Sequence, residues 1–510
     1  MGFLAGCQQY PRNKSHAHIP LASIQKGEGL AKKHCASCHA FTDPSLLDVK
    51  SWEKGVLPHM GPRLGIFTFN FESYPSSRYD VFLDSNFYPQ KPLVTPEEWQ
   101  HIVNYITAVA PDSLPAQTKE QPIEKELSLF NVEVLQVGVD VPVTTFVKLN
   151  PFGNNTGLLL FDYKAKKAYG YDASLTKRDS FSVAGALVDG LLEKDRLLLC
   201  NIGVLNPNNG RFGKLQALNG NANGSHSFDT LPLITNLQRP VAMEAADFNR
   251  DGKQDYLVCE FGFLTGSLSW YQQTATGGFT KQELRAQPGA AKAYVQDYNK
   301  DGWPDIWALF AQGEEGIFLY TNKGNGTFTQ KQLLRMPPVY GSTYFELADF
   351  NDDGHQDILY TCGDNADFST IFKPYHGVYI YLNDGRNNFK KAFFYPINGC
   401  FKALARDFDG DGDLDIATIS YFADYVQQPD EGFVYFENLG NFSFHPYSIE
   451  AATRGRWLTM DAGDIDGDGR TDLVLGNFAG GPMMVKPRNN WKKGPPFILL
   501  KNTGIKKRNQ

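Results

Sequence analysis

From about residue 127 to residue 505, short apolar runs alternate with polar loops. Runs such as Tyr256 to Val258 and Leu473 to Leu475 each follow an Asp-rich loop. A second apolar run comes next and ends in Asn or Asp plus Gly, as at Asp384-Gly385, and a third run then begins with Phe. Runs of this length between turn residues predict β-strands. We therefore expect an all-β region made of repeated groups of strands.

The amino-terminal part of the chain has a helical pattern instead. Four apolar residues there fall on one face of a helix: Trp99, Ile102, Val103 and Ile106. Thr95 precedes them as the expected N-cap, with Pro96 at the first helical position and Glu98 completing a capping box. Residues 27–34 predict a second, short helix. Residues 111–126 contain three Pro and many charges, which is the composition of a linker.

The β-region contains five copies of a nine-residue loop. The copies begin at Asp247, Asp297, Asp349, Asp407 and Asp464, so their spacings are 50, 52, 58 and 57 residues. Each loop has oxygen-bearing side chains at positions 1, 3, 5 and 9, a residue at position 7 that can add its carbonyl, and Gly at position 6 for a sharp turn. Such oxygen ligands suit Ca²⁺. The Glu at position 12 of an EF-hand is missing, and predicted strands flank the loop, so an EF-hand is excluded.

The loops predict up to five Ca²⁺ ions, which we expect to stabilise the loops. The candidate ligands are Asp247, Asn249, Asp251, Asp255, Asp297, Asn299, Asp301, Asp305, Asp349, Asn351, Asp353, Asp357, Asp407, Asp409, Asp411, Asp415, Asp464, Asp466, Asp468 and Asp472.

The repeats resemble the FG-GAP/VCBS repeat family, most strongly over residues 235–505, and this resemblance implies a β-propeller. Two further periods upstream, residues 143–182 and 183–200, have the strands without the metal loop, so we expect seven blades. An open integrin-like variant or an eight-bladed ring is the alternative. The last repeat lacks its outermost strand, and residues 130–135 resemble that strand. We expect them to complete the last blade and close the ring, because an unpaired edge favours aggregation.

Cys35-Ala36-Ser37-Cys38-His39 has the spacing of a c-type haem attachment site. In such a site the two thiols form thioether bonds with the haem, and His39 binds the iron as the proximal ligand. A zinc site would need a second pair of ligands, and the sequence has no second Cys pair. A redox dithiol would be expected next to a βαβ pattern, whereas the flanking residues predict helix. We therefore expect one covalent haem c.

The surrounding segment resembles class I cytochrome c, with the predicted helix after Thr95 in the place of the family's last helix. This resemblance implies a multidomain chain: a small all-α cytochrome c domain followed by an all-β propeller. The family's distal Met usually lies shortly before that helix, but residues 87–92 contain no Met. Residues 52–60 resemble a W-x-x-x-V-x-x-x-M pattern of short bacterial cytochromes, which implies Met60 as the distal ligand. If residues 61–65 are instead the family's Gly-Pro-x-Leu loop, then His59, His101 or an open site is the alternative.

The amino terminus adds a prediction about location. Leu4 to Cys7 resemble a bacterial lipoprotein box, in which Cys7 is lipidated, and the haem motif also requires export. We expect an exported protein in the periplasm or on the outer cell surface, anchored to a membrane through Cys7. The resulting segments are a tether (1–21), the cytochrome c domain (22–112), a linker (113–126), the propeller (127–505) and a basic tail (506–510).

Composition and charge exclude further classes of protein. The 510 residues carry a formal charge of −7, which argues against a general nucleic-acid binder. No run approaches 18 apolar residues, so no transmembrane helix is predicted. The five loops hold 19 Asp, about a third of the 56 acidic residues. The net charge of −7 therefore applies to the chain without bound Ca²⁺. We expect the remaining cysteines to be buried free thiols, although an oxidising compartment permits a disulfide: Cys200, Cys259, Cys362 and Cys400.

Three functions are compatible with these features. The leading hypothesis is a monohaem c-type cytochrome that transfers electrons to a redox partner protein, with the Ca²⁺-binding propeller as a docking or binding module. A second is a propeller redox enzyme that oxidises a sugar or alcohol and passes the electrons to the haem. A third is a cell-surface adhesion or glycan-binding protein. No nucleophile elbow, Rossmann glycine motif or P-loop is present, so an electron-transfer protein is favoured over a catalyst.

Overall fold

The computed structural model describes residues 13–135, 140–153, 156–194, 196–220, 225–366, 368–483 and 489–504. The chain forms two compact units. The N-terminal unit consists of Met1–Gln117 with Pro337–Val339 and Asn365–Pro374. The second unit contains the rest of the chain from Thr118 onward. Cys7 and the predicted tail 506–510 lie outside the described residues, so the lipidation of Cys7 stays a prediction.

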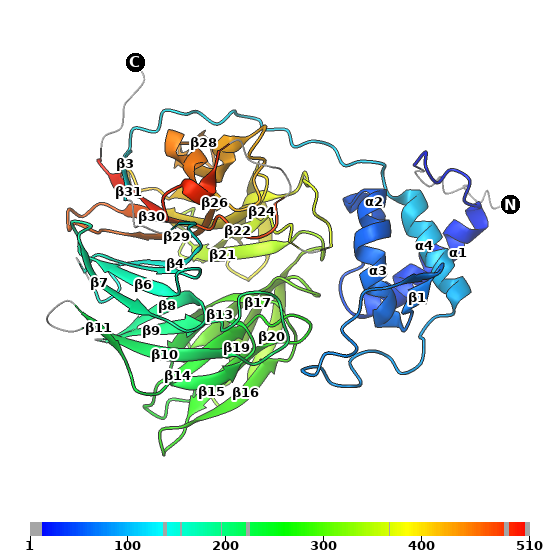
Figure 1. Cartoon of the computed structure of the whole chain (residues 1–510), viewed down its shortest axis with the longest axis horizontal. Helices are drawn as coiled ribbons and strands as arrows, with labels where there is room; N and C mark the ends of the chain where they lie inside the picture. Colours follow the sequence, from blue (N-terminus) through cyan, green and yellow to red (C-terminus); the bar gives the residue numbers. More distant parts are fainter. Residues whose placement is uncertain are drawn as a thin grey trace. The chain divides into compact units, whose positions relative to one another are not determined.

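The second unit is a seven-bladed β-propeller, as predicted (Figure 1). Blade 1 contains β4 (Thr144–Leu149), β5 (Leu158–Asp162), β6 (Lys167–Tyr171) and β7 (Lys177–Ser182), and blade 2 contains β8 (Leu187–Glu193), β9 (Arg196–Asn201), β10 (Gly213–Gly220), β11 (His226–Phe228) and β12 (Ile234–Leu237). Blade 3 contains β13 (Pro240–Ala246), β14 (Asp255–Glu260), β15 (Ser267–Gln273) and β16 (Phe279–Arg285), and blade 4 contains β17 (Ala290–Gln296), β18 (Asp305–Phe310), β19 (Gly316–Asn322) and β20 (Phe328–Arg335). Blade 5 contains β21 (Ser342–Ala348), β22 (Asp357–Cys362), β23 (Gly377–Asn383) and β24 (Phe389–Pro396). Blade 6 contains β25 (Cys400–Arg406), β26 (Asp415–Ser420), β27 (Phe433–Asn438) and β28 (Phe444–Tyr447), and blade 7 contains β29 (Trp457–Gly463), β30 (Asp472–Asn477), β31 (Phe497–Asn502) and β3 (Phe130–Val134).

The second strand of each blade is the most apolar, because both of its faces are covered by neighbouring blades. Every residue of β14, β18, β22, β26 and β30 is buried. The outer strands β16 and β20 contain no buried residue. The first strand of every blade carries a register shift after its first residue, as between Ala290 and Lys292. A bulge of this kind bends the strand and increases its twist.

The last blade is completed by a strand from the other end of the propeller sequence, as predicted. β3 pairs antiparallel with β31, so that Phe130 lies opposite Asn502 and Val134 opposite Ile498 (Figure 1). Phe130 is buried and makes edge contacts with the rings of Phe408 and Tyr435 in blade 6. The ring is therefore closed by backbone pairing and by a buried aromatic side chain.

Residues 118–126, within the predicted linker, are bonded to blades 5 and 6. Lys119 Nζ lies 2.5 Å from Oε1 of the buried Glu431. The hydroxyl of Tyr395 donates to the Gln121 carbonyl at 2.7 Å. Glu124 donates its backbone N–H to the Pro446 carbonyl at 3.0 Å. This stretch is therefore part of the propeller's surface.

The N-terminal unit contains two long helices, α1 (Leu21–His34) and α4 (Pro96–Val109). Between them lie α2 (Val49–Ser51), a π-helical turn (Trp52–Val56), α3 (Leu57–Met60) and a two-stranded hairpin of β1 (Thr68–Phe69) and β2 (Glu72–Ser73). α1 packs against α4, and Gly27 allows this approach because a Cβ there would lie 1.9 Å from the His101 carbonyl oxygen. No helix among the described residues is long and apolar enough to cross a membrane.

Helix α4 begins as the sequence predicts. The Thr95 hydroxyl accepts from the Glu98 backbone N–H at 3.2 Å, and the Glu98 carboxylate accepts from the Thr95 N–H at 2.9 Å. This reciprocal pair satisfies two N–H groups that the helix itself cannot. Trp99, Ile102 and Ile106 are buried on the predicted face.

The predicted fold class is wrong in its first part, because no separate all-α cytochrome c domain is seen. Most of the chain is the propeller, and in the described residues only α1 and α4 are α-helices longer than four residues. The N-terminal unit contains a β-hairpin and incorporates two segments from the later chain. The physical reason lies in residues 65–94, where Pro75, Pro89 and Pro92 interrupt any helical pattern.

Candidate functional site

The Cys-x-x-Cys-His motif lies directly after helix α1. The helix ends at His34, and Cys35 to Ser37 continue it as a tighter helical turn. Both cysteines are free thiols, with Cys38 exposed and Cys35 half-buried. Burial, helped by the neighbouring Cys38, raises the pKa of the Cys35 thiol to about 11. The two thiols therefore lie at the surface end of one helix, both available for covalent attachment.

His39 is oriented by its own neighbourhood. Its Nδ1 lies 2.8 Å from the Ala40 carbonyl oxygen. Because a carbonyl oxygen only accepts, Nδ1 is the donor in this bond, and Nε2 is the ring nitrogen that a metal could bind. A metal-binding histidine typically has this arrangement, with one ring nitrogen held by a backbone carbonyl and the other free to coordinate. The motif therefore fits a haem with His39 as an axial ligand.

The three predicted distal candidates lie in different surroundings. Met60 ends helix α3 and, like Cys35, packs at the edge of the hydrophobic cluster of the N-terminal unit. His59 donates from Nδ1 to the Gly55 carbonyl at 2.7 Å, and its ring stacks on Phe368 at 4.0 Å. His101 Nδ1 lies 2.7 Å from the Ser23 hydroxyl between α1 and α4. Met60 and Cys35 thus share a cluster, and the choice among the candidates stays a prediction.

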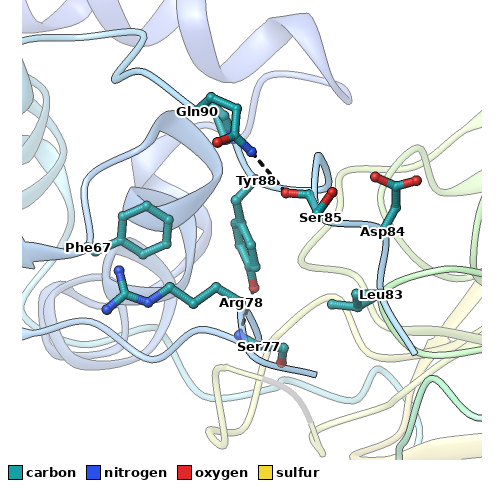
Figure 2. A pocket seen from close by; sticks show the side chains of 9 residues that line it. Phe67, Ser77, Arg78, Leu83, Asp84, Ser85, Tyr88 and Gln90 are labelled. Atoms are coloured by element: carbon teal, nitrogen blue, oxygen red, sulfur yellow. Dashed lines mark hydrogen bonds between the residues drawn. The ribbon is translucent and has the colours of Figure 1, made fainter. Parts of the chain in front are cut away.

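A cavity of about 210 Å³ lies in the irregular loop of the N-terminal unit, and no sequence motif predicted it (Figure 2). Its lining residues are Phe67, Ser77, Arg78, Leu83, Asp84, Ser85, Tyr88, Pro89 and Gln90. The Arg78 guanidinium lies 4.9 Å from the centre of the Phe67 ring. The Tyr88 hydroxyl accepts from the Ser77 N–H at 2.9 Å, which joins the two sides of the loop. Its lining mixes aromatic and polar side chains.

The five Asp-rich loops share one geometry. In each, the first Asp accepts the backbone N–H groups of positions 5 and 6; for example, Asp297 accepts from Asp301 at 3.0 Å and from Gly302 at 2.8 Å. The Asp at position 9 is fully buried in all five loops. One of its oxygens accepts an N–H from the third strand of its blade, as Asp415 does from Asn438 at 2.8 Å.

The position-9 carboxylates are buried near other carboxylates, and both factors raise their pKa values. Burial, with a smaller contribution from neighbouring Asp side chains, raises the pKa of Asp415 to about 7 and those of Asp305 and Asp472 to about 6. A cation between the carboxylates would relieve this repulsion. The loops therefore fit a divalent cation by chemistry as well as by spacing.

Two of the loops bring three carboxylates within reach of one ion. Oxygens of Asp407, Asp409 and Asp415 lie within 4.8 Å of one another, and so do those of Asp464, Asp466 and Asp472. The other three loops place Asn at position 3, so an amide oxygen stands in for one carboxylate. In the last loop, Lys501 Nζ lies 2.8 Å from Asp466, and this ammonium would compete with a bound cation.

The remaining cysteines are buried, as predicted. Cys200, Cys259, Cys362 and Cys400 all have no exposed surface, and none of them forms a disulfide with another described residue. Burial raises the pKa of the Cys200, Cys259 and Cys400 thiols. These groups stay protonated and act as small apolar side chains.

Comparison with known proteins supports the repeat assignment. A family model described as an FG-GAP-like repeat matches residues 297–360, which span the loops at Asp297 and Asp349. The structures that resemble the chain include the N-terminal domain of Nup159, at 10% identity and a TM-score of 0.42, covering 76% of this chain and 99% of that one. The Dos1 propeller matches at 11% identity and a TM-score of 0.43, covering 75% and 82%.

A third similar structure is BBS1N in complex with ARL6DN, at 10% identity and a TM-score of 0.44, covering 76% of this chain and 99% of that one. No curated protein matches the chain. The strand pairing makes the second unit a seven-bladed β-propeller, and the family model assigns an FG-GAP-like repeat to residues 297–360 within it.

Proposed function

We propose that this protein carries one haem, attached covalently through Cys35 and Cys38, and transfers single electrons to or from a redox partner protein. The observation that carries the proposal is the Cys-x-x-Cys-His motif together with the hydrogen bond from His39 Nδ1 to the Ala40 carbonyl. A bound haem would supply a one-electron iron couple. The chain's residues would hold and tune it.

Each residue has a defined task in this proposal. Cys35 and Cys38 fix the position of the group, and the Ala40 carbonyl holds the His39 ring so that Nε2 faces away from the backbone. Met60 is the proposed second axial ligand. A thioether in that position raises the reduction potential, which suits electron transfer. His59, fixed by Gly55 and Phe368, is the alternative ligand.

The propeller is proposed as a Ca²⁺-stabilised docking or binding module. Support comes from the five equivalent loops and from the carboxylate clusters of Asp407 and Asp464 with their partners. The proposal includes export, because the haem motif requires it, and anchoring through Cys7. The redox-enzyme and glycan-binding alternatives stay predictions.

Covalent haem is tested by expressing the full chain with and without a haem-attachment system. The purified protein is expected to show a c-type absorption spectrum and a mass increased by one haem after denaturation. The double variant Cys35→Ala/Cys38→Ala should lose the covalent haem. Cys200→Ala, a buried thiol outside the motif, is the matched control and should keep it. A wild-type protein without covalent haem would refute the proposal.

The distal ligand is tested by comparing Met60→Ala with His59→Ala in the haem-loaded protein. If Met60 binds the iron, only Met60→Ala should change the low-spin spectrum and shift the reduction potential. An unchanged spectrum and potential for Met60→Ala would exclude Met60. A change in the His59 variant alone would assign His59 instead.

A further inference from the structure

The cavity in the irregular loop of the N-terminal unit is held open by the loop's own hydrogen bonds. The Tyr88 hydroxyl accepts from the Ser77 N–H at 2.9 Å. The Gln90 side-chain amide donates to the Ser85 carbonyl, also at 2.9 Å. These bonds connect the two ends of residues 77–90, so the cavity exists before any ligand enters it. A preformed cavity of this kind costs little ordering entropy on binding.

Part of the cavity wall is aromatic. The rings of Phe67 and Tyr88 meet edge to face with their centres 5.6 Å apart, and Leu83 and Pro89 add apolar surface to the lining. An apolar cavity of about 150 Å³ holds a benzene ring. The volume of about 210 Å³ here therefore has room for one six-membered ring with a small substituent. The aromatic wall favours a planar ring, because aromatic rings attract one another in edge-to-face and offset-stacked pairs.

Arg78 supplies a cation to the lining. Its Cζ atom lies 4.9 Å from the centre of the Phe67 ring and 4.8 Å from the centre of the Tyr79 ring. Among the residues that the structure describes, no carboxylate oxygen lies within 4.0 Å of the guanidinium nitrogens. The two rings contact the faces of the guanidinium, so the N–H groups along its edge stay available for an anion. That edge matches a carboxylate, which accepts two parallel N–H bonds.

Asp84 is the one carboxylate among the lining residues, and it limits the charge of a ligand. Its Oδ1 accepts from the Asn86 N–H at 2.7 Å. Figure 2 shows the guanidinium of Arg78 and the carboxylate of Asp84 on opposite sides of the Tyr88 ring. A ligand with one negative charge can place it on Arg78 and keep it away from Asp84. A second negative charge on the ligand would be repelled by Asp84, so a monoanion is favoured over a dianion.

We propose that this cavity binds a monocyclic aromatic monocarboxylate, with the ligand's carboxylate on Arg78 and its ring against Phe67 and Tyr88. The Tyr88 hydroxyl accepts the Ser77 N–H and keeps its own proton to donate to the ligand. Inorganic phosphate lacks the ring and carries more charge, so it fits less well. The proposal does not depend on the haem, because no lining residue belongs to the Cys-x-x-Cys-His motif.

The test is titration calorimetry of the full-length protein with benzoate, benzamide and inorganic phosphate. Benzamide has the shape of benzoate without its charge, so benzoate should bind at least about tenfold more tightly, since hydrogen bonds to a charged group contribute about this much. Benzoate should bind both the wild type and Cys35→Ala/Cys38→Ala. Binding to the haem-free variant alone would mean that a haem carboxylate takes this place, and it would overturn the proposal. A wild type without haem would refute only the proposed function.

Two variants separate the charge from the space. Arg78→Gln should weaken benzoate binding about tenfold and leave benzamide binding unchanged. Ser85→Trp, at an exposed position of the lining, should fill the cavity and abolish the binding of both. Arg386→Gln, which replaces an exposed arginine of the propeller, is the matched control and should bind benzoate like wild type. Benzoate that binds no more tightly than benzamide or phosphate, or equally well to both cavity variants, would overturn the proposal.

Discussion

The closure of the propeller by β3 leads to a quantitative prediction for Phe130→Ala. The Phe130 side chain is 5% exposed and contacts Phe408 and Tyr435 at ring-centre distances of 5.9 and 6.0 Å. Removing a buried Phe side chain typically costs about 3–5 kcal/mol, of which each aromatic pair contributes about 0.5–1.5 kcal/mol. We expect this loss to appear in the free energy of unfolding of the propeller.

The matched control is Val132→Ala, which lies on the same strand and is 38% exposed. It keeps the backbone pairing with β31 and should cost about 1 kcal/mol or less. The assay is urea unfolding followed by tryptophan fluorescence, since the buried Trp457 belongs to the same hydrophobic cluster as Phe130. With a slope of about 3 kcal/mol/M, the Phe130→Ala midpoint should fall by about 1–1.7 M. Equal midpoints for the two variants would refute the claim that Phe130 helps to close the ring.

Three further predictions concern buried charge. Removing Ca²⁺ with a chelator should lower the melting temperature of the propeller, because each site adds about 2.7 kcal/mol of stability at a free Ca²⁺ concentration one hundred times the dissociation constant. Asp415→Asn should reduce that response, and calorimetry with and without chelator measures both. Burial raises the pKa of Glu431 from 4.5 to about 7, so its contribution to stability is complete below pH 4.5 and is lost as the pH rises through 7. The free energy of unfolding should fall by about 3 kcal/mol over this range. Urea midpoints measured from pH 5 to pH 8.5 should therefore fall less in Glu431→Gln than in wild type, and an equal fall in the two proteins would contradict this. Arg456→Met should destabilise the propeller by about 3 kcal/mol, because the buried Arg456 side chain, 1% exposed, donates hydrogen bonds to the Tyr421 and Gly480 carbonyls that the variant would lose. An unfolding midpoint equal to that of wild type would show that those carbonyls find other partners.

The propeller could be predicted from the sequence because the same pattern of loop and strands recurs along the chain. Five loops in one phase define the blade length, and the strand after each loop is apolar on both faces because neighbouring blades cover it. The match between residues 130–135 and the outermost strand of other repeats predicted the pairing of β3 with β31. The start of α4 was predictable for a similar reason, because the capping box is a local signal that depends on three residues.

The N-terminal unit was less predictable, because its structure depends on residues distant in the chain. Phe368, inserted between β22 and β23, stacks on His59, and Val339 and Ile371 pack against the core of this unit. No local pattern in residues 22–112 predicts these contacts. The pairing of Lys292 with Glu244 was equally hard to predict, since it depends on which blades are neighbours and not on the repeat itself.

The position of β3 in the sequence also sets the timing of assembly during synthesis. β31 begins about 360 residues after β3 ends, so at about 5–20 residues per second β3 leaves the ribosome about 20–70 s before its partner exists. During that interval the ring is open, because β3 has no partner until β31 has been made. The synthesis of β31 therefore decides whether the earlier blades persist, and a chain truncated before Phe497 should be a substrate for chaperones and proteases.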